Sequence, residues 1–321
     1  MSKIKRYVLF FCIFAVCLNL IGCAGVSDII PNAAEENMDF EFGIIEIFVF
    51  GISDADAVFI TTENYTAMID TGENKHGDEI LNYIKSRGIN KIDYLILTHF
   101  HKDHIGGAHI LIDNLEVKKI ITPNYGKESK HYERFANAVN NAGTEIEIEV
   151  LAIKDTLKFT LDGAEFAVYP PQSEYRKYGG ENDETNKDKD DDKDKDEDET
   201  DENNYSLVIR AAHGGNNFLF AGDAKAKRLK ELLSNDEIIT ADYDYLKVPH
   251  HGRYNKRSLD FIYAIRPKNA VITCALNNPA DERVINALEN IGADIYFTPN
   301  GGVYCKSDGK SLTIQQIQQD N

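Results

Sequence analysis

Four residues of types that bind metal ions stand within six positions of one another: His99, His101, Asp103 and His104. Imidazole and carboxylate groups suit Zn²⁺, Mn²⁺ and Fe²⁺. Four such groups on one short loop exceed what a single ion with an open catalytic position takes, so the cluster predicts two metal ions. A lone histidine is usually a surface residue or a hydrogen-bonded core residue, but a His-x-His-x-Asp-His cluster is typical of a metal site.

The flanking residues predict that this cluster lies on a loop at the end of a buried strand. Residues 91–97 are a short apolar run, and the loop ends at a Gly-Gly pair. Another strand-like run, residues 243–248, leads into His250 and His251. A histidine pair at a strand exit repeats the geometry of the first loop, so we expect both loops at strand ends along one edge of the fold.

The cluster resembles the signature of the metallo-β-lactamase superfamily. Within that superfamily the chain is most similar to the hydrolase domain of ComEC-type competence proteins, which take up DNA. The closer similarity is carried by four further stretches: residues 68–72, 205–209, 218–223 and 246–252. The resemblance implies an α/β fold, the four-layer αββα sandwich, and a metal-dependent hydrolase.

The same resemblance assigns the second ion and its surroundings. It makes Asp223 the bridge between two divalent ions, with Zn²⁺ expected and Mn²⁺ as the alternative. It places one histidine of the pair 250/251 on the second ion without deciding which, and we favour His250 as the ligand, with His251 facing the substrate. Asp70 would lie behind the ligands, where such carboxylates orient a metal loop. Asp103 and Asp223 would share the charge of the ions and carry a proton, so these two and His251 are the predicted catalytic residues.

The first ion has the weaker predicted ligand set. In many superfamily members a third histidine for this ion stands just before a Ser-Leu pair, and this chain has Asn203 and Asn204 there. The resemblance therefore leaves the ion with His99 and His101 and a weaker or water-mediated third contact. Asn204 is the substituted ligand or an outer residue in this interpretation.

A basic patch indicates the class of substrate. Lys247, Arg253, Lys256 and Arg257 form the densest group of positive charges beyond the N-terminal residues. Arginine and lysine bind phosphate, although a solvated start of a helix explains the patch equally well. Together with the resemblance, the patch favours a phosphodiester such as DNA or another phosphate polymer. The net charge of −18 disfavours nucleic acid, because an acidic chain repels it.

Two other functions stay open, and no protein partner is implied. A lactonase or β-lactamase would use the same metal ligands, but the basic patch argues against it. A non-catalytic surface lipoprotein that keeps the fold for binding is consistent with Asn203 and Asn204 at the third ligand position.

The N-terminus predicts export and a lipid anchor. Three basic residues precede an apolar run of about 15 residues, which is typical of a signal peptide and shorter than the roughly 20 apolar residues that span a bilayer. Residues 20–23, Leu-Ile-Gly-Cys, resemble a bacterial lipobox, in which the signal peptide 1–22 is removed and Cys23 carries the lipid. The mature protein is then expected outside the cytoplasm, held at the bacterial cell membrane by a flexible tether, residues 23–39.

Residues 40–318 are expected to form one metallo-β-lactamase-type domain. Strand-like and helix-like segments interleave along them, which indicates the α/β class, and a hydrophobic content of 42% supports a full-sized core. Residues 181–202 interrupt the pattern with 14 Asp or Glu against 4 Lys. This composition is unable to bury a core, so we predict a disordered acidic insertion.

Overall fold

The computed structural model describes residues 42–143, 145–175 and 201–318. The predicted signal peptide, Cys23, the tether and residues 181–200 of the acidic insertion lie outside these ranges. None of the helices within them is both long enough and apolar enough to cross a bilayer. The last two residues of the predicted insertion, Asp201 and Glu202, lie inside them, and Glu202 begins a 3₁₀ helix.

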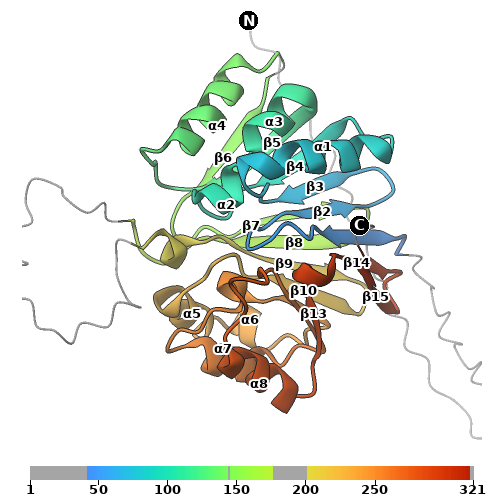
Figure 1. Ribbon diagram of the computed structural model, residues 1–321, viewed down its shortest axis with the longest axis vertical. Helices are drawn as coiled ribbons and strands as arrows, with labels where there is room; N and C mark the ends of the chain where they lie inside the picture. The colour runs from blue at the N-terminus through green and yellow to red at the C-terminus, as the bar shows by residue number, and fades with distance from the viewer. Residues whose placement is uncertain (1–41, 144, 176–200, 319–321) are drawn as a thin grey trace, which may run out of the picture. The chain divides into compact units, whose positions relative to one another are not determined.

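One sheet has eight strands in the order β15-β14-β1-β2-β3-β4-β5-β6, of which β3 to β6 run parallel and the others pair antiparallel (Figure 1). Its strands are β1 Ile45–Val49, β2 Val58–Thr61, β3 Thr66–Ile69, β4 Lys91–Ile96, β5 Glu116–Pro123, β6 Glu147–Leu151, β14 Gly302–Ser307 and β15 Leu312–Ile317. The helices that follow β3 to β5 are α1 Gly77–Ser86, α2 Lys102–Ile105, α3 Ala108–Asn114 and α4 Lys130–Asn141.

The second sheet has seven strands in the order β13-β12-β11-β10-β9-β8-β7, with β10 to β13 parallel. Its strands are β7 Leu157–Leu161, β8 Ala164–Tyr169, β9 Val208–His213, β10 Asn216–Phe220, β11 Tyr245–Lys247, β12 Asn269–Ile272 and β13 Asp294–Phe297. Its helices are α5 Ala226–Leu232, α6 Asp236–Ile239, α7 Ser258–Ile265 and α8 Glu282–Asn290. The described 3₁₀ helices are η1 Asn74–His76, η3 Glu202–Tyr205, η4 Pro249–Gly252 and η5 Thr298–Asn300.

Three layers of apolar side chains hold these elements together. One lies between the two sheets, a second between the eight-stranded sheet and α1 to α4, and a third between the seven-stranded sheet and α5 to α8 (Figure 1). In β1, alternate residues Ile45, Ile47 and Val49 are buried, as expected for a strand with one face in the core. The predicted four-layer αββα sandwich is confirmed.

Two glycines allow the first histidine loop to pack closely against its neighbours. A Cβ atom on Gly106 would collide with the backbone of Lys102 and Asn74, and one on Gly107 would collide with the carbonyl oxygen of Thr71. The Gly-Gly pair therefore does more than end a loop, because it lets α2 and the turn after β3 share one small volume.

Candidate metal centre

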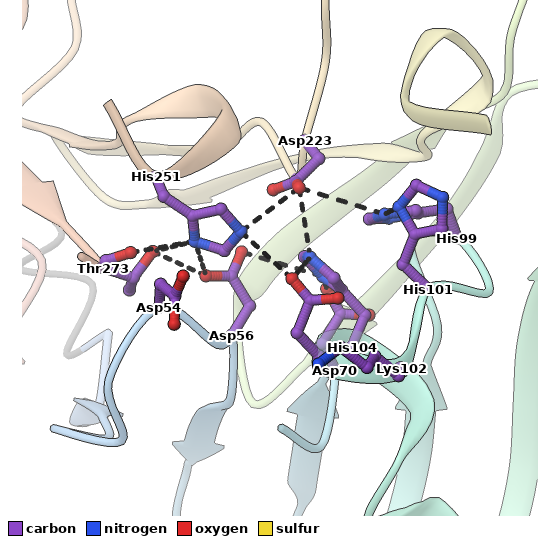
Figure 2. Close-up of polar contacts among 12 residues, drawn as sticks. Asp54, Asp56, Asp70, His99, His101, Lys102, His104, Asp223, His251 and Thr273 are labelled. Carbon is purple, nitrogen blue, oxygen red and sulfur yellow. Dashed lines mark hydrogen bonds and ion pairs between the residues drawn. The ribbon is translucent and has the colours of Figure 1, made fainter. Parts of the chain in front are cut away.

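The side chains of the site extend from loops that leave the carboxyl ends of parallel strands in both sheets. The loop after β4 carries His99, His101 and His104, while the exits of β10 and β11 carry Asp223 and His251. Figure 2 shows these side chains converging, with Asp223 above His104 and between the rings of His99 and His251. The carboxyl edge of parallel strands is where α/β sheets bind ligands, so topology brings the two predicted loops together.

Asp103, His104, Asp223 and His251 form one compact group of candidate metal ligands. One ligand atom of each lies within 4.8 Å of the others. Oδ2 of Asp223 is 3.3 Å from Nε2 of His104, 3.2 Å from Nε2 of His251 and 4.0 Å from Nε2 of His99. Nε2 of His104 and Nε2 of His251 are buried, and both face the carboxylates of Asp103 and Asp223 at distances from 3.2 to 3.8 Å. Two buried imidazole nitrogens that face carboxylate oxygens in one small space form a ligand set that fits a divalent cation.

His99 and His101 form a second possible site beside this group. Nε2 of His99 lies 3.1 Å from Nδ1 of His101, so both nitrogens face the same space. Asn204 is fully buried, and its Oδ1 accepts hydrogen bonds from the backbone N–H groups of Lys227 and Arg228 at the start of α5. The amide oxygen that we considered as a substituted ligand thus caps a helix.

His250 and His251 have the opposite arrangement to the predicted one. The sequence interpretation favoured His250 as the ligand, but it is His251 that joins the group around Asp223, while His250 is outside it. Nδ1 of His251 lies 2.8 Å from the carbonyl oxygen of Thr273, which directs Nε2 towards the site. Both histidines have positive φ angles, 51° and 55°, so the backbone that carries the two rings is in the left-handed region, which residues other than glycine rarely adopt.

Lys247 does not present its charge to a substrate, contrary to the predicted phosphate role. Its side chain is 2% exposed, because β11 is a central strand with both faces covered. The ammonium group contacts the carboxylate of Asp56 and the carbonyl oxygen of Gly222, the latter at 3.2 Å. Arg253 remains at the surface with a side chain 37% exposed and an ion pair to Asp54 at 3.1 Å, and Lys256 is half-buried.

Asp70 lies behind the first loop. Its Oδ2 is 2.8 Å from Nδ1 of His104, and its Oδ1 accepts a hydrogen bond from the backbone N–H of Thr98, also at 2.8 Å. The φ angle of Asp70 is 57°, a strained conformation for this residue type that the surrounding contacts maintain. The carboxylate therefore fixes both the tautomer and the orientation of the His104 ring.

The family model of the metallo-beta-lactamase superfamily matches residues 51–275, a range that includes both histidine loops and Asp223. The chain belongs to this superfamily. It is 28% identical to ComE operon protein 3 of Bacillus subtilis (strain 168) over 282 residues, which cover 80% of this chain and 32% of that protein. It is 26% identical to Recombination protein 2 of Haemophilus influenzae over 231 residues, 70% of this chain and 23% of that protein.

The chain thus spans about a third or less of the length of these two relatives. Among solved structures, Tm1679, described as a metal-dependent hydrolase of the beta-lactamase superfamily, matches with a TM-score of 0.52 at 11% identity. The match covers 86% of this chain and all of the other. The superfamily and the fold predicted from the histidine motif are confirmed.

Two acidic residues of this metallo-beta-lactamase site escaped the sequence analysis. Asp56 precedes β2 and is 3% exposed, and its Oδ1 accepts a hydrogen bond from Oγ1 of Thr273 at 2.6 Å. Glu202 is 9% exposed and lies 3.8 Å from Nε2 of His101. Asp56 stands in a short turn-like stretch, and Glu202 ends the acidic run that we expected to be disordered. Nothing in the sequence around either residue distinguishes it from an ordinary surface carboxylate.

The buried carboxylates hold positive charge on two of the histidines in the metal-free protein. Burial disfavours the charged form of His104, but Asp223 and Asp70 outweigh this effect and raise its pKa well above the usual value. Burial likewise opposes the charge of His251, and Asp223 and Asp56 raise its pKa to about 9. Both rings are therefore protonated at neutral pH when no cation is present.

Three other members of the site, Asp223, Asp103 and His99, have lowered pKa values. Burial raises the pKa of Asp223, but the charges of His251 and His104 lower it well below its usual range. For Asp103 burial is again outweighed, here by the hydrogen bond to His251, so its pKa is also lowered. Burial lowers the pKa of His99 well below the usual value. Asp103 and Asp223 of the metallo-beta-lactamase centre are thus ionised and His99 is neutral, the protonation states in which these side chains bind a cation.

Zn²⁺ binding by the metal-free protein is expected to release protons and to tighten as the pH rises from about 6 to 9. A metal ligand has to be neutral, so Zn²⁺ competes with the proton on His251, whose pKa is about 9, and with the proton on His104. Below these pKa values each ring must lose a proton first, and above about 9 the competition from His251 ends. Calorimetric titrations at pH 7 in buffers of different ionisation enthalpy measure the release. Binding without proton release would contradict the assigned ligands.

Proposed function

We propose that this metal-dependent hydrolase cleaves phosphodiester bonds, in DNA or another phosphate polymer, at the cell surface. The observation that carries the proposal is the position of one carboxylate oxygen, Oδ2 of Asp223. It faces imidazole nitrogens from both histidine loops at 3.2, 3.3 and 4.0 Å. An oxygen so placed can bridge two ions, and paired ions are typical of phosphoesterases.

The residues of the site have separate roles in the proposed hydrolysis. Two divalent ions, if held by these ligands, would supply an acidified water and would neutralise charge on a phosphoryl oxygen. Asp103 is the most exposed carboxylate of the group, at 22%, and its Oδ2 lies 3.4 Å from Nε2 of His251. It is therefore the residue that can pass a proton between the site and solvent. Asp70 holds His104, and Thr273 holds His251, so the two rings stay aimed at Asp223.

The phosphodiester class is supported by the similarity to competence-type proteins and by the cations that remain at the surface. Arg253 and Lys256 follow the second histidine loop directly, and Arg253 forms an ion pair with partly exposed Asp54. A phosphate group could compete for that guanidinium at small cost, since exposed ion pairs contribute about 1 kcal/mol or less. Lys247 has no part in this recognition.

A substrate panel tests the proposal. Purified protein loaded with Zn²⁺ or Mn²⁺ would be assayed with bis-p-nitrophenyl phosphate, single-stranded and double-stranded DNA, a lactone and a β-lactam. We expect hydrolysis of the phosphodiesters. Hydrolysis confined to the lactone or the β-lactam would replace the proposal with the alternative hydrolase, and no hydrolysis at all would favour the binding lipoprotein.

Surface location is proposed from the lipobox-like residues 20–23. Replacing Cys23 with alanine is expected to move the protein from the membrane fraction to the soluble fraction or to leave the signal peptide uncleaved, because the lipid acceptor is lost. Fractionation of the bacterial host followed by immunoblotting measures both effects. Cys274→Ala, a change at a buried core cysteine, serves as the control that should keep the wild-type distribution. Unchanged processing and membrane association of Cys23→Ala would exclude the anchor.

A further inference from the structure

We propose that Glu202 is a positioning residue for the first metal ion, acting through His101 in place of the missing third histidine. The inference rests on the two-ion site of the proposed function. His101 offers Nδ1 to the space that it shares with Nε2 of His99, 3.1 Å away. If Nδ1 binds the ion, Nε2 of the same ring carries the proton and points away from it.

Glu202 is the carboxylate at that second nitrogen. Its Oε1 lies 3.8 Å from Nε2 of His101, which is an ion-pair contact and longer than a hydrogen bond. The proposal therefore includes a small side-chain movement that brings the two groups to hydrogen-bond distance when the ion binds. A carboxylate that accepts the outer proton of a metal-bound histidine fixes its tautomer and makes it a stronger ligand.

Glu202 is held in place from two sides. Oε1 forms an ion pair with Nζ of Lys127 at 2.6 Å, and the hydroxyl group of Tyr125 donates to Oε2 at 3.4 Å. The same hydroxyl accepts a hydrogen bond from the backbone N–H of Phe100, between the two histidines. Glu202 is 9% exposed and is connected to the metal loop through the hydroxyl group of Tyr125. It is therefore a buried, fixed part of the site and not a mobile surface carboxylate.

The place of Glu202 in the chain explains why it takes this role. It directly precedes Asn203 and Asn204, where many superfamily members have the third histidine. The Oδ1 atom of Asn204 accepts hydrogen bonds at the start of α5, so this side chain stabilises the helix. The third histidine is therefore missing as a ligand of the first ion. In its place, the carboxylate of Glu202 would stabilise the ion by orienting His101, a ligand that is present.

Zinc titration of the metal-free, full-length protein tests the inference. Calorimetry with a competing chelator would give the two dissociation constants. Glu202→Gln keeps the shape of the side chain and removes its charge, and we expect it to weaken the poorer site about 10- to 100-fold while leaving the better one unchanged. Glu237→Gln is a matched control, since Glu237 also pairs with a lysine and a tyrosine hydroxyl, Lys158 at 3.2 Å and Tyr169 at 2.8 Å, far from the loops.

A second readout works on the wild-type protein alone, in case the variant does not fold. In nitrogen-15 spectra of the zinc-loaded protein, His101 should bind through Nδ1 and keep a proton on Nε2 that exchanges slowly with water. Binding through Nε2, or unchanged zinc constants in Glu202→Gln, would overturn the inference. A protein that shows the expected zinc binding but hydrolyses no phosphodiester would refute the proposed function and leave this inference in place.

Discussion

Replacing Asp223 with alanine is expected to abolish phosphodiester hydrolysis and to lower the metal content of the purified protein. Asp223 is 2% exposed and is the only group among the described residues whose oxygen faces His99, His104 and His251 together. Loss of about 4 kcal/mol of charge stabilisation by the ions would reduce the rate about 10³-fold. Metal analysis by mass spectrometry and the rate of bis-p-nitrophenyl phosphate hydrolysis measure the two effects.

Asp260→Ala is a suitable control for this experiment. Asp260 is an exposed carboxylate at the start of α7, paired with Arg257 at 3.0 Å, so its loss should change neither metal content nor rate. An Asp223→Ala protein that keeps both ions and most of its activity would show that Asp223 is not a bridging ligand, and the two-ion mechanism would have to be abandoned.

Replacing Lys247 with methionine is expected to destabilise the metal-free protein by about 3–5 kcal/mol. The methionine fits the apolar path of the lysine stem but removes the ammonium that contacts Asp56 and lies 3.9 Å from Oδ1 of Asp223. Asp56 is 3% exposed, so its carboxylate would be left buried beside fewer positive groups. Urea unfolding followed by circular dichroism gives the difference in the free energy of unfolding.

A second lysine–aspartate pair provides the comparison. Lys268 forms an ion pair with Asp244 at 2.7 Å, but its side chain is 71% exposed. Lys268→Met should therefore change the free energy of unfolding by no more than about 1 kcal/mol, because exposed pairs are screened by solvent. Equal effects of the two substitutions would mean that the buried position of Lys247 has no energetic importance.

The parts of the site that the sequence predicted are those encoded by local spacing. His99, His101, Asp103 and His104 are close in the chain and therefore close in space, and the apolar runs before each loop predicted the strands that carry them. The interleaving of strands and helices indicated the α/β class, whereas the order of layers came from the superfamily resemblance alone. The spacing of the ligands and the strands before each loop depend on few long-range contacts, so pattern analysis was sufficient for them.

The parts that it missed depend on contacts between distant segments or on backbone angles. Lys247 was interpreted as a surface cation because nothing in its neighbourhood shows that β11 lies between two other strands and contacts Asp56. The choice between His250 and His251 could not be made from the sequence, because both residues have positive φ angles that no residue preference predicts. Glu202 was hidden at the end of an acidic run, and its burial becomes visible only when Lys127 and Tyr125 are placed around it.

The division of the ligands between the two sheets has a consequence for how the protein unfolds. His99 and His104 follow β4 of one sheet, and Asp223 and His251 follow β10 and β11 of the other. Neither half of the sandwich contains a complete site, so any opening that separates the halves releases the ions. Free metal at 1,000 times its dissociation constant adds about 4 kcal/mol against such opening. If the site binds metal in this way, we expect a higher metal concentration to favour unfolding of the two halves together over unfolding of one after the other.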